Sequence, residues 1–280
     1  MRAKIDGEIF ARSIFALSAV ISILAVALIC VFLAANSFPA LREIGVLKFL
    51  FGTSWKPSDI PPSYGVLPMI LGSLYVTAGA VIIGVPIGVL TAVFLAKCCP
   101  KKIYKLIKPG VDLLAGIPSV VYGFFGMAIL LPVFGGSIIS ASILLGIMIL
   151  PTVIGLSEAA LRAVPESYYE GALALGAGHY RATFAAVLPA AKSGIFAAVI
   201  LGIGRAIGET MAVIMVAGNQ ARIPSSIFKG VRTLTSNIVL EMGYAEGLHR
   251  QALIATGLVL FVFILIINLS FQALKSRSKS

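Results

Sequence analysis

Long apolar stretches alternate with shorter polar ones along the whole chain. A helix needs about 20 apolar residues to cross a bilayer. Six stretches approach or exceed that length, at about residues 13–35, 67–96, 111–134, 140–157, 193–217 and 251–272. A transmembrane β-barrel would need segments of about ten residues that alternate apolar and polar side chains, and these runs are unbroken. The pattern therefore predicts an all-α, polytopic membrane protein with six transmembrane helices.

Composition supports the same class. Hydrophobic residues make up 59% of the 280-residue chain and charged residues 12%, whereas soluble domains average about 45–50% apolar and about 25% charged residues. We expect residues 1–280 to form one transmembrane domain, with a long polar loop at 158–192 between the fourth and fifth spans.

The charges are distributed unevenly between the two sides that six spans would create. The net charge is +11, and fourteen Lys and Arg residues fall on the side that holds both termini, including the basic tail at 275–280, against seven on the other. Positive charge is retained in the cytoplasm, so both termini and the loop 158–192 are predicted to be cytoplasmic. The loops 36–66 and 218–250 then face outside. This distribution indicates membrane topology, and we expect the lipid bilayer, with no nucleic acid, among the partners.

Sequence signatures of catalysis are absent. The chain contains no GxxxxGK[ST] phosphate-binding loop, no HExxH and no GxSxG, so it is predicted neither to hydrolyse ATP nor to act as a hydrolase. Its cysteines are Cys30, Cys98 and Cys99, without the CxxC or Cys/His spacing of a zinc site. We therefore expect no catalytic residues, no metal and no cofactor.

The polar loop at 158–192 carries a distinctive spacing. An alanine-rich run at 171–175 predicts a short helix that Gly176 terminates, and Pro189 marks the entry to the next helix. The spaced residues are Glu170, Gly171, Ala172, Gly176, Ala186, Leu188 and Pro189.

This spacing resembles the EAA loop of ABC importer permeases, which reads Glu-Ala-Ala, three residues, Gly, nine residues, then Ile-x-Leu-Pro. Gly171 stands in place of the first alanine and Ala186 in place of the isoleucine. The resemblance implies that a helix at 166–176 seats in a groove of a cytoplasmic ATPase and passes its movement to the fifth span. The alternative is an ordinary amphipathic loop.

Two charged residues interrupt the fifth span. Arg205 and Glu209 are separated by four residues, so in a helix they share one face and can form an ion pair. A charge in a transmembrane helix costs about 2.5–3.5 kcal/mol on insertion scales, so it needs a partner or an aqueous pathway. The guanidinium fork suits an oxyanion. The pair is therefore either an anion-transfer site, in which Glu209 holds Arg205 when no anion is bound, or a structural ion pair.

Further segments extend the resemblance. RAIGETMAVIMVAGN at 205–219 and LLAGIPSVVYGFFG at 113–126, with FLFGTSWKP and YGVLPMILGSL in the first half of the chain, are similar to the PstC-type permeases of high-affinity phosphate importers. The resemblance implies a type I ABC importer permease bundle. It also implies a heterodimer with a sister PstA-type permease, two cytoplasmic ATP-binding subunits and an extracytoplasmic phosphate-binding protein.

The same resemblance implies site residues. Arg205, Glu209 and Thr210 are expected to line the translocation route. In the third span Pro118 is expected to open the helix, and Ser119 and Tyr122 either line the pore or only pack.

The leading hypothesis is thus a permease subunit of an ATP-driven inorganic phosphate importer, forming half of the translocation pathway. Two alternatives remain open: a permease for another oxyanion, such as molybdate or sulfate, and an anion channel or carrier that works without ATP.

Overall fold

The computed structural model describes the backbone of residues 2–277 and the side-chain surroundings of residues 12–270 and 273. Within this part, four helices are long and apolar enough to cross a membrane, and six such units exist if each of two bent helix pairs counts as one span. The prediction of an all-α polytopic membrane protein is confirmed. The end of the predicted basic tail, residues 278–280, lies outside the described residues.

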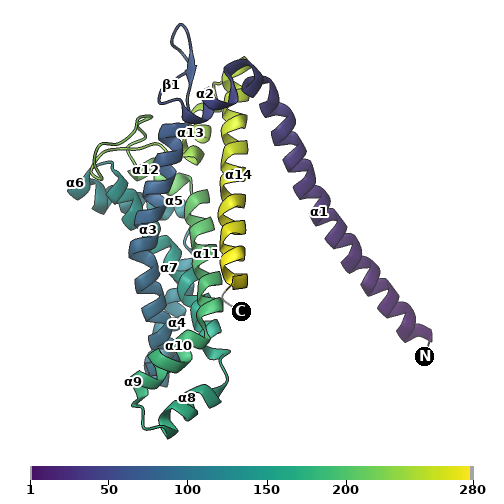
Figure 1. The fold of residues 1–280 in the computed structure, drawn as a ribbon, viewed down its shortest axis with the longest axis vertical. Helices are drawn as coiled ribbons and strands as arrows, with labels where there is room; N and C mark the ends of the chain where they lie inside the picture. The colour runs from purple at the N-terminus through teal and green to yellow at the C-terminus, as the bar shows by residue number, and fades with distance from the viewer. Residues whose placement is uncertain (1, 278–280) are drawn as a thin grey trace.

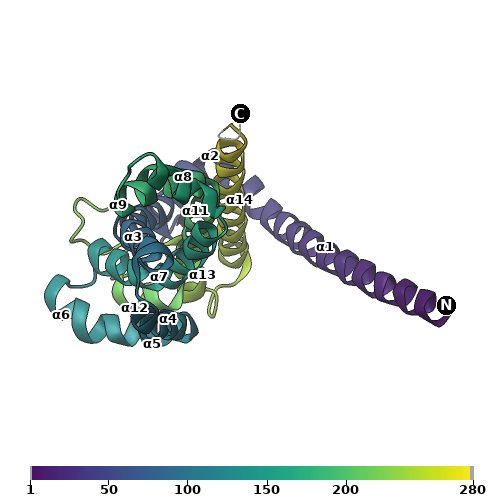
Figure 2. The same ribbon diagram turned by 90° about the horizontal axis from the view of Figure 1, so that it is seen from below.

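The first helix stands apart from the rest. α1 (Arg2–Ile44) projects away from the bundle in two perpendicular views (Figure 1, Figure 2). It joins the bundle near its C-terminal end, where it packs against α14 (Gly247–Arg277). The expected polar loop from residue 36 is therefore wrong over its first part. The helix continues through these residues, and Ser37 and Ala40 are fully buried in its last turns.

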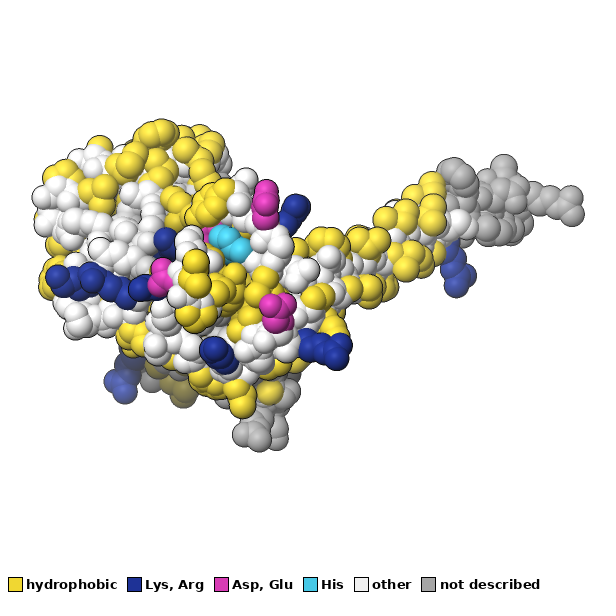
Figure 3. Space-filling view, turned by 90° about the horizontal axis from the view of Figure 1, so that it is seen from above, with side chains coloured by type: hydrophobic (Ala, Val, Ile, Leu, Met, Phe, Trp, Pro, Cys, Tyr) yellow, Lys and Arg dark blue, Asp and Glu magenta, His cyan; other side chains and the backbone are white. Residues whose placement is uncertain are grey.

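Small elements cover the end of the bundle at the top of Figure 1, which we call the loop end. They are α2 (Val46–Phe51), an antiparallel hairpin of β1 (Trp55–Lys56) and β2 (Ser63–Tyr64), and α13 (Leu234–Glu241). Seen from this end, acidic and basic side chains are scattered among apolar ones and do not gather into one patch (Figure 3).

A buried carboxylate holds the loop end together. Glu241 accepts hydrogen bonds from Trp55 Nε1 at 2.8 Å and from Arg232, and it lies 2.9 Å from His249 Nε2. Buried charges are tolerated when they are paired and hydrogen-bonded. These contacts join the hairpin, α13 and the start of α14 into one unit.

The centre of the bundle is a close pair of helices. α3 (Leu67–Val93) lies along α7 (Ile138–Arg162), and a Cβ added at Gly79, Gly84 or Gly88 would fall less than 3.0 Å from atoms of α7. Glycines allow two helices to approach this closely in a membrane. α7 continues a turn beyond its expected end at residue 157.

The third predicted span is not one straight helix. α4 (Lys101–Gly116) is followed by α5 (Ser119–Phe125), a π-helical segment and α6 (Leu131–Phe134), and the two halves are bent by 100° at the break. The expected start of this span at residue 111 is wrong, because that residue lies inside α4, and the span is bent sharply at a break.

Proline explains the break in the third span. Pro118 has no N–H to donate and disfavours helical geometry at Ile117, which is extended. The break leaves the carbonyl of Leu114 in α4 without its usual helical donor. The hydroxyl of Tyr122 donates a hydrogen bond to this oxygen at 2.8 Å. The prediction that Pro118 opens the helix is confirmed.

The opposite end of the bundle, at the bottom of Figure 1, is a helical elbow. It comprises α8 (Glu166–Ala174), α9 (His179–Ala182), a π-helical segment and α10 (Leu188–Ala190). The chain then bends by 70° into α11 (Lys192–Gly208). A short α12 (Met211–Val216) follows, so the expected single helix over 193–217 is interrupted.

Candidate functional site

Arg205 lies in the last turn of α11 and is only half-buried. Its Nη1 donates a hydrogen bond to Thr152 Oγ1 of α7 at 3.2 Å. Within the described part of the chain, no carboxylate forms an ion pair with this guanidinium. The hydrogen-bond partner that the described structure gives this charge is therefore one neutral hydroxyl.

The predicted ion pair between Arg205 and Glu209 is wrong. α11 ends at Gly208, and Glu209 is extended, with φ −68° and ψ 133°. Its Oε1 accepts a hydrogen bond from the backbone N–H of Ala212 at 3.2 Å, and its carbonyl accepts one from Thr235 Oγ1 at 3.1 Å. The carboxylate thus satisfies a free N–H at the start of α12, as an acidic residue at a helix N-terminus does.

Thr210 completes the break between α11 and α12. Its Oγ1 donates to the carbonyl of Gly208 at 3.2 Å, an oxygen that the interrupted helix leaves without its usual partner. Glu209 and Thr210 both therefore stabilise the interruption in the described structure. Their place on a translocation route stays a prediction.

The two helix breaks lie near each other, because α5 packs against α12. Tyr122 is buried. Ser119 is the first residue of α5 and is half-buried. The structure gives Tyr122 a hydrogen bond across the break. That Ser119 and Tyr122 line a route stays a prediction.

Thr152 contacts Arg205, although nothing in the sequence singles it out. It follows Pro151 inside α7, and 53 positions separate it from Arg205. A threonine is common in an apolar helix, so its presence in the sequence does not indicate a functional site. Only the packing of α7 against α11 reveals the contact.

The elbow has the predicted helix and the predicted end. Gly176 has φ +84°, its N–H donates to the carbonyl of Leu173 at 2.8 Å, and the N–H of Ala177 donates to that of Ala172 at 3.1 Å. These two bonds form the Schellman motif that ends many helices. The prediction that Gly176 terminates a short helix is confirmed.

Several residues of the elbow face away from the bundle. Glu170 and Gly171 are exposed on α8, while Ala172 is half-buried. Among the large apolar side chains, Leu175 is 91% exposed and Tyr180 70% exposed. Both side chains therefore lie on the exposed surface of the elbow.

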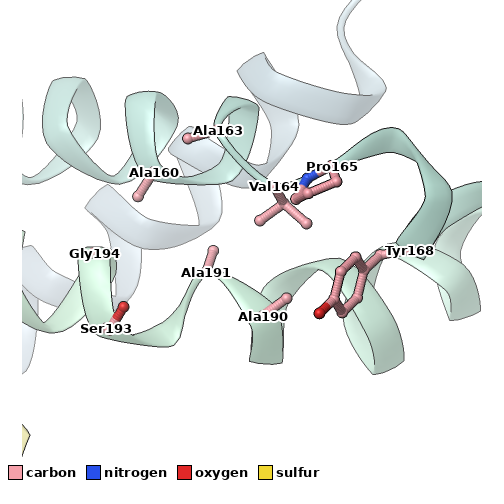
Figure 4. A pocket seen from close by; sticks show the side chains of 9 residues that line it. All are labelled: Ala160, Ala163, Val164, Pro165, Tyr168, Ala190, Ala191, Ser193 and Gly194. Atoms are coloured by element: carbon pink, nitrogen blue, oxygen red, sulfur yellow. The ribbon is translucent and has the colours of Figure 1, made fainter. Parts of the chain in front are cut away.

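Leu188 and Pro189 lie in α10, directly before the bend into α11. Beneath the bend is a groove of about 330 Å³. Figure 4 shows it between the end of α7 and the start of α11, with Tyr168 at one end. Its walls are made mostly of small side chains, and an added Cβ at Gly194 would fall less than 3.0 Å from Ala160 Cβ. At Gly194, beside the groove, α11 thus approaches α7 too closely for a larger residue.

The described residues contain no group of three or more His, Cys, Asp or Glu side chains that could hold a metal ion. The candidate site is thus an unpaired arginine beside two helix breaks, with an exposed elbow at the opposite end of α11.

Comparison with known proteins gives the family. Residues 84–280 match the family described as the binding-protein-dependent transport system inner membrane component. The chain belongs to this family. A member is a multi-pass membrane subunit of a transport system, and its role is therefore that of a permease, not of a catalytic subunit.

Two relatives match the permease over most of its length. It is 38% identical to the probable ABC transporter permease protein YqgH of Bacillus subtilis (strain 168), over 97% of this chain and 92% of the relative. It is 33% identical to the phosphate transport system permease protein PstC of Mesorhizobium japonicum (strain LMG 29417 / CECT 9101 / MAFF 303099), over 85% and 81%.

The fold is also found in a solved transporter. The permease superposes on a chain of a bacterial alginate ABC transporter, crystallised in complex with an alginate pentasaccharide-bound periplasmic protein, with a TM-score of 0.63. The match covers 95% of this chain and 96% of that chain at 16% identity. This likeness supports the fold as that of an ABC importer permease.

Proposed function

We propose that this permease is a subunit of an ATP-driven importer of inorganic phosphate and forms half of its translocation pathway. The observation that carries the proposal is the unpaired guanidinium of Arg205. A cation in an apolar span costs about 2.5–3.5 kcal/mol on insertion scales, and one hydroxyl of Thr152 is a small compensation. An oxyanion that passes the site would supply the missing acceptors.

The names of the relatives favour phosphate among the oxyanions. A 33% identical relative is named a phosphate transport system permease protein PstC. The guanidinium alone accepts any tetrahedral oxyanion, so molybdate and sulfate are the competing substrates. Selection is then expected mainly at an extracytoplasmic phosphate-binding protein that delivers the anion.

The proposed assembly contains a sister PstA-type permease and two ATP-binding subunits on the cytoplasmic side. The exposed α8 with Glu170, Gly171 and Ala172 is the surface we assign to the ATPase. Leu188 and Pro189 carry its movement into α11, because they lie directly before the bend. The excess of Lys and Arg on the elbow side favours the cytoplasm for this end and for both termini.

The proposed mechanism follows from the chain order. ATP-driven movement of the ATPase tilts α8, the bend passes the tilt to α11, and the far end of α11 carries Arg205. The helix breaks at Pro118 and Glu209 allow the halves on either side to move separately. Alternating access then consists of opening the region around Arg205, Thr210, Ser119 and Tyr122 first to one side and then to the other.

Reconstituted uptake tests this function. The complete complex in proteoliposomes should import phosphate only with ATP and a loaded binding protein, and an excess of sulfate or molybdate should not compete. Phosphate uptake that persists after the ATP-binding subunits are removed would support an ATP-independent channel or carrier instead. Preferred uptake of sulfate or molybdate would assign the permease to that oxyanion.

A further inference from the structure

Lys97 connects the end of the second span to the elbow. It lies in the π-helical segment Phe94–Cys98 that follows α3. Its Nζ lies 3.4 Å from Glu166 Oε2 of α8 and 5.6 Å from the centre of the Tyr169 ring. The side chain of Lys97 is only 12% exposed, so a cation–π contact and an ion pair hold it against α8.

Tyr169 extends this connection to the next helix. Its hydroxyl hydrogen-bonds with Nδ1 of His179, the first residue of α9, and the two rings meet edge to face at 5.6 Å between centres. The two short helices of the elbow are therefore fastened together at the point where Lys97 reaches them.

Arg162 anchors the same region from the other side. Its Nη2 donates to the carbonyl of Leu95 at 3.0 Å, and its Nε donates to Glu158 at 2.9 Å. A cavity of about 360 Å³ separates these anchors from α8. It is lined by Ala96, Lys97, Arg162, Glu166, Tyr169 and His179. Tyr169 of α8 packs against an apolar cluster that includes Ala92 and Val93 at the end of α3, and Lys97 adds a charged contact to α8 beside it.

The far end of this connection reaches the neighbourhood of Arg205. α3 lies so close to α7 that a Cβ at Gly88 would fall 2.8 Å from Val153 Cγ1. Val153 is adjacent to Thr152, whose hydroxyl holds the guanidinium of Arg205. Close-packed helices transmit displacement because little free volume exists to absorb it.

We propose that Lys97 is a positioning residue that links the coupling helix α8 to α3. It gives the movement of α8 a second route to Arg205, through α3 and α7, besides the covalent route through α11. The inference rests on the proposed function, since it requires an ATPase that moves α8. A connected set of contacts becomes a coupling route only when perturbing it changes the coupling, so the test measures coupling directly.

The experiment uses the complete complex in proteoliposomes with saturating loaded binding protein. It measures ATP hydrolysed and phosphate imported in the same sample, and the amount of ATPase that co-purifies. Lys97→Gln should raise the ATP used per phosphate by about threefold to fivefold, the effect expected of one ion pair and one cation–π contact. Lys97→Arg keeps both contacts and should match the wild type. Lys102→Gln, an exposed lysine on α4, is the matched control and should change nothing.

Glu166→Gln removes the ion pair with little change in packing, because the Glu166 side chain is 63% exposed. It should raise the ATP used per phosphate imported without lowering the amount of ATPase that co-purifies. The charge exchange Lys97→Glu with Glu166→Lys should recover part of the coupling lost in Lys97→Glu, but not the cation–π contact.

Three results would overturn the proposal. The first is a wild-type ratio of ATP hydrolysed to phosphate imported in both Lys97→Gln and Glu166→Gln. The second is that the charge exchange restores none of the coupling lost in Lys97→Glu. The third is a loss of coupling that missing ATPase explains entirely. If the wild-type complex itself imports no phosphate with ATP, the proposed function fails instead, and the two failures are thereby distinguished.

Discussion

Replacing Gly194 by alanine should force the start of α11 away from α7. Gly194 lies in the first turn of α11, and an added Cβ would fall less than 3.0 Å from the Cβ of Ala160 (Figure 4). The Cβ of alanine has no rotamer that moves it out of the way. The backbones of α7 and α11 must therefore separate at the groove beneath the bend.

The size of the effect follows from two opposing contributions. Overpacking a close contact costs about 1–3 kcal/mol, while replacing glycine by alanine in a helix gains up to about 1 kcal/mol. We expect a net loss of about 1 kcal/mol, which lowers Tm by about 2–4 °C for a chain of this size. Gly171→Ala is the matched control, because Gly171 lies in α8 with no atom within 4 Å of an added Cβ. That variant should be stabilised.

Thermal unfolding of the purified permease in detergent measures both variants. Phosphate uptake by the assembled complex should fall for Gly194→Ala, because the bend then transmits the movement of α8 less directly. A Gly194→Ala protein that unfolds at or above the temperature of Gly171→Ala would refute the close contact between α7 and α11.

Two further substitutions test the site and the elbow. Thr152→Val removes the hydroxyl that holds Arg205 and should lower phosphate uptake about tenfold, the effect of one hydrogen bond to a charged group. Thr152→Ser keeps the hydroxyl and should retain uptake. Equal uptake by the two variants would exclude this contact. Gly176→Ala places a side chain at φ +84° and should cost about 1–2 kcal/mol of stability. This loss should be seen as a lower Tm and weaker retention of the ATPase. A wild-type Tm would contradict the left-handed turn.

The elements that the sequence predicts correctly depend on local patterns. Apolar runs identify the helices, and the glycine at residue 176 indicates a helix end. Each of these features is decided by residues within one or two turns, so a single sequence contains the information.

The features that the sequence misses depend on distant contacts. The helix break after Gly208 is stabilised by Thr235, which lies 26 positions after Glu209. The four-residue spacing alone wrongly suggests that Arg205 and Glu209 pair. The extension of α1 beyond residue 35 depends on its packing against α14. The contact of Arg205 with Thr152 requires that α7 and α11 be placed side by side, which no periodicity specifies.

Phosphate uptake by the Arg205→Ala complex tests the central claim most directly. We expect uptake to be abolished in assembled complexes that contain normal amounts of the sister permease and ATPase. Arg222→Ala, which removes an exposed arginine near the loop end, should import phosphate like the wild type. Wild-type uptake by the Arg205→Ala complex would contradict the claim that this unpaired cation receives the anion.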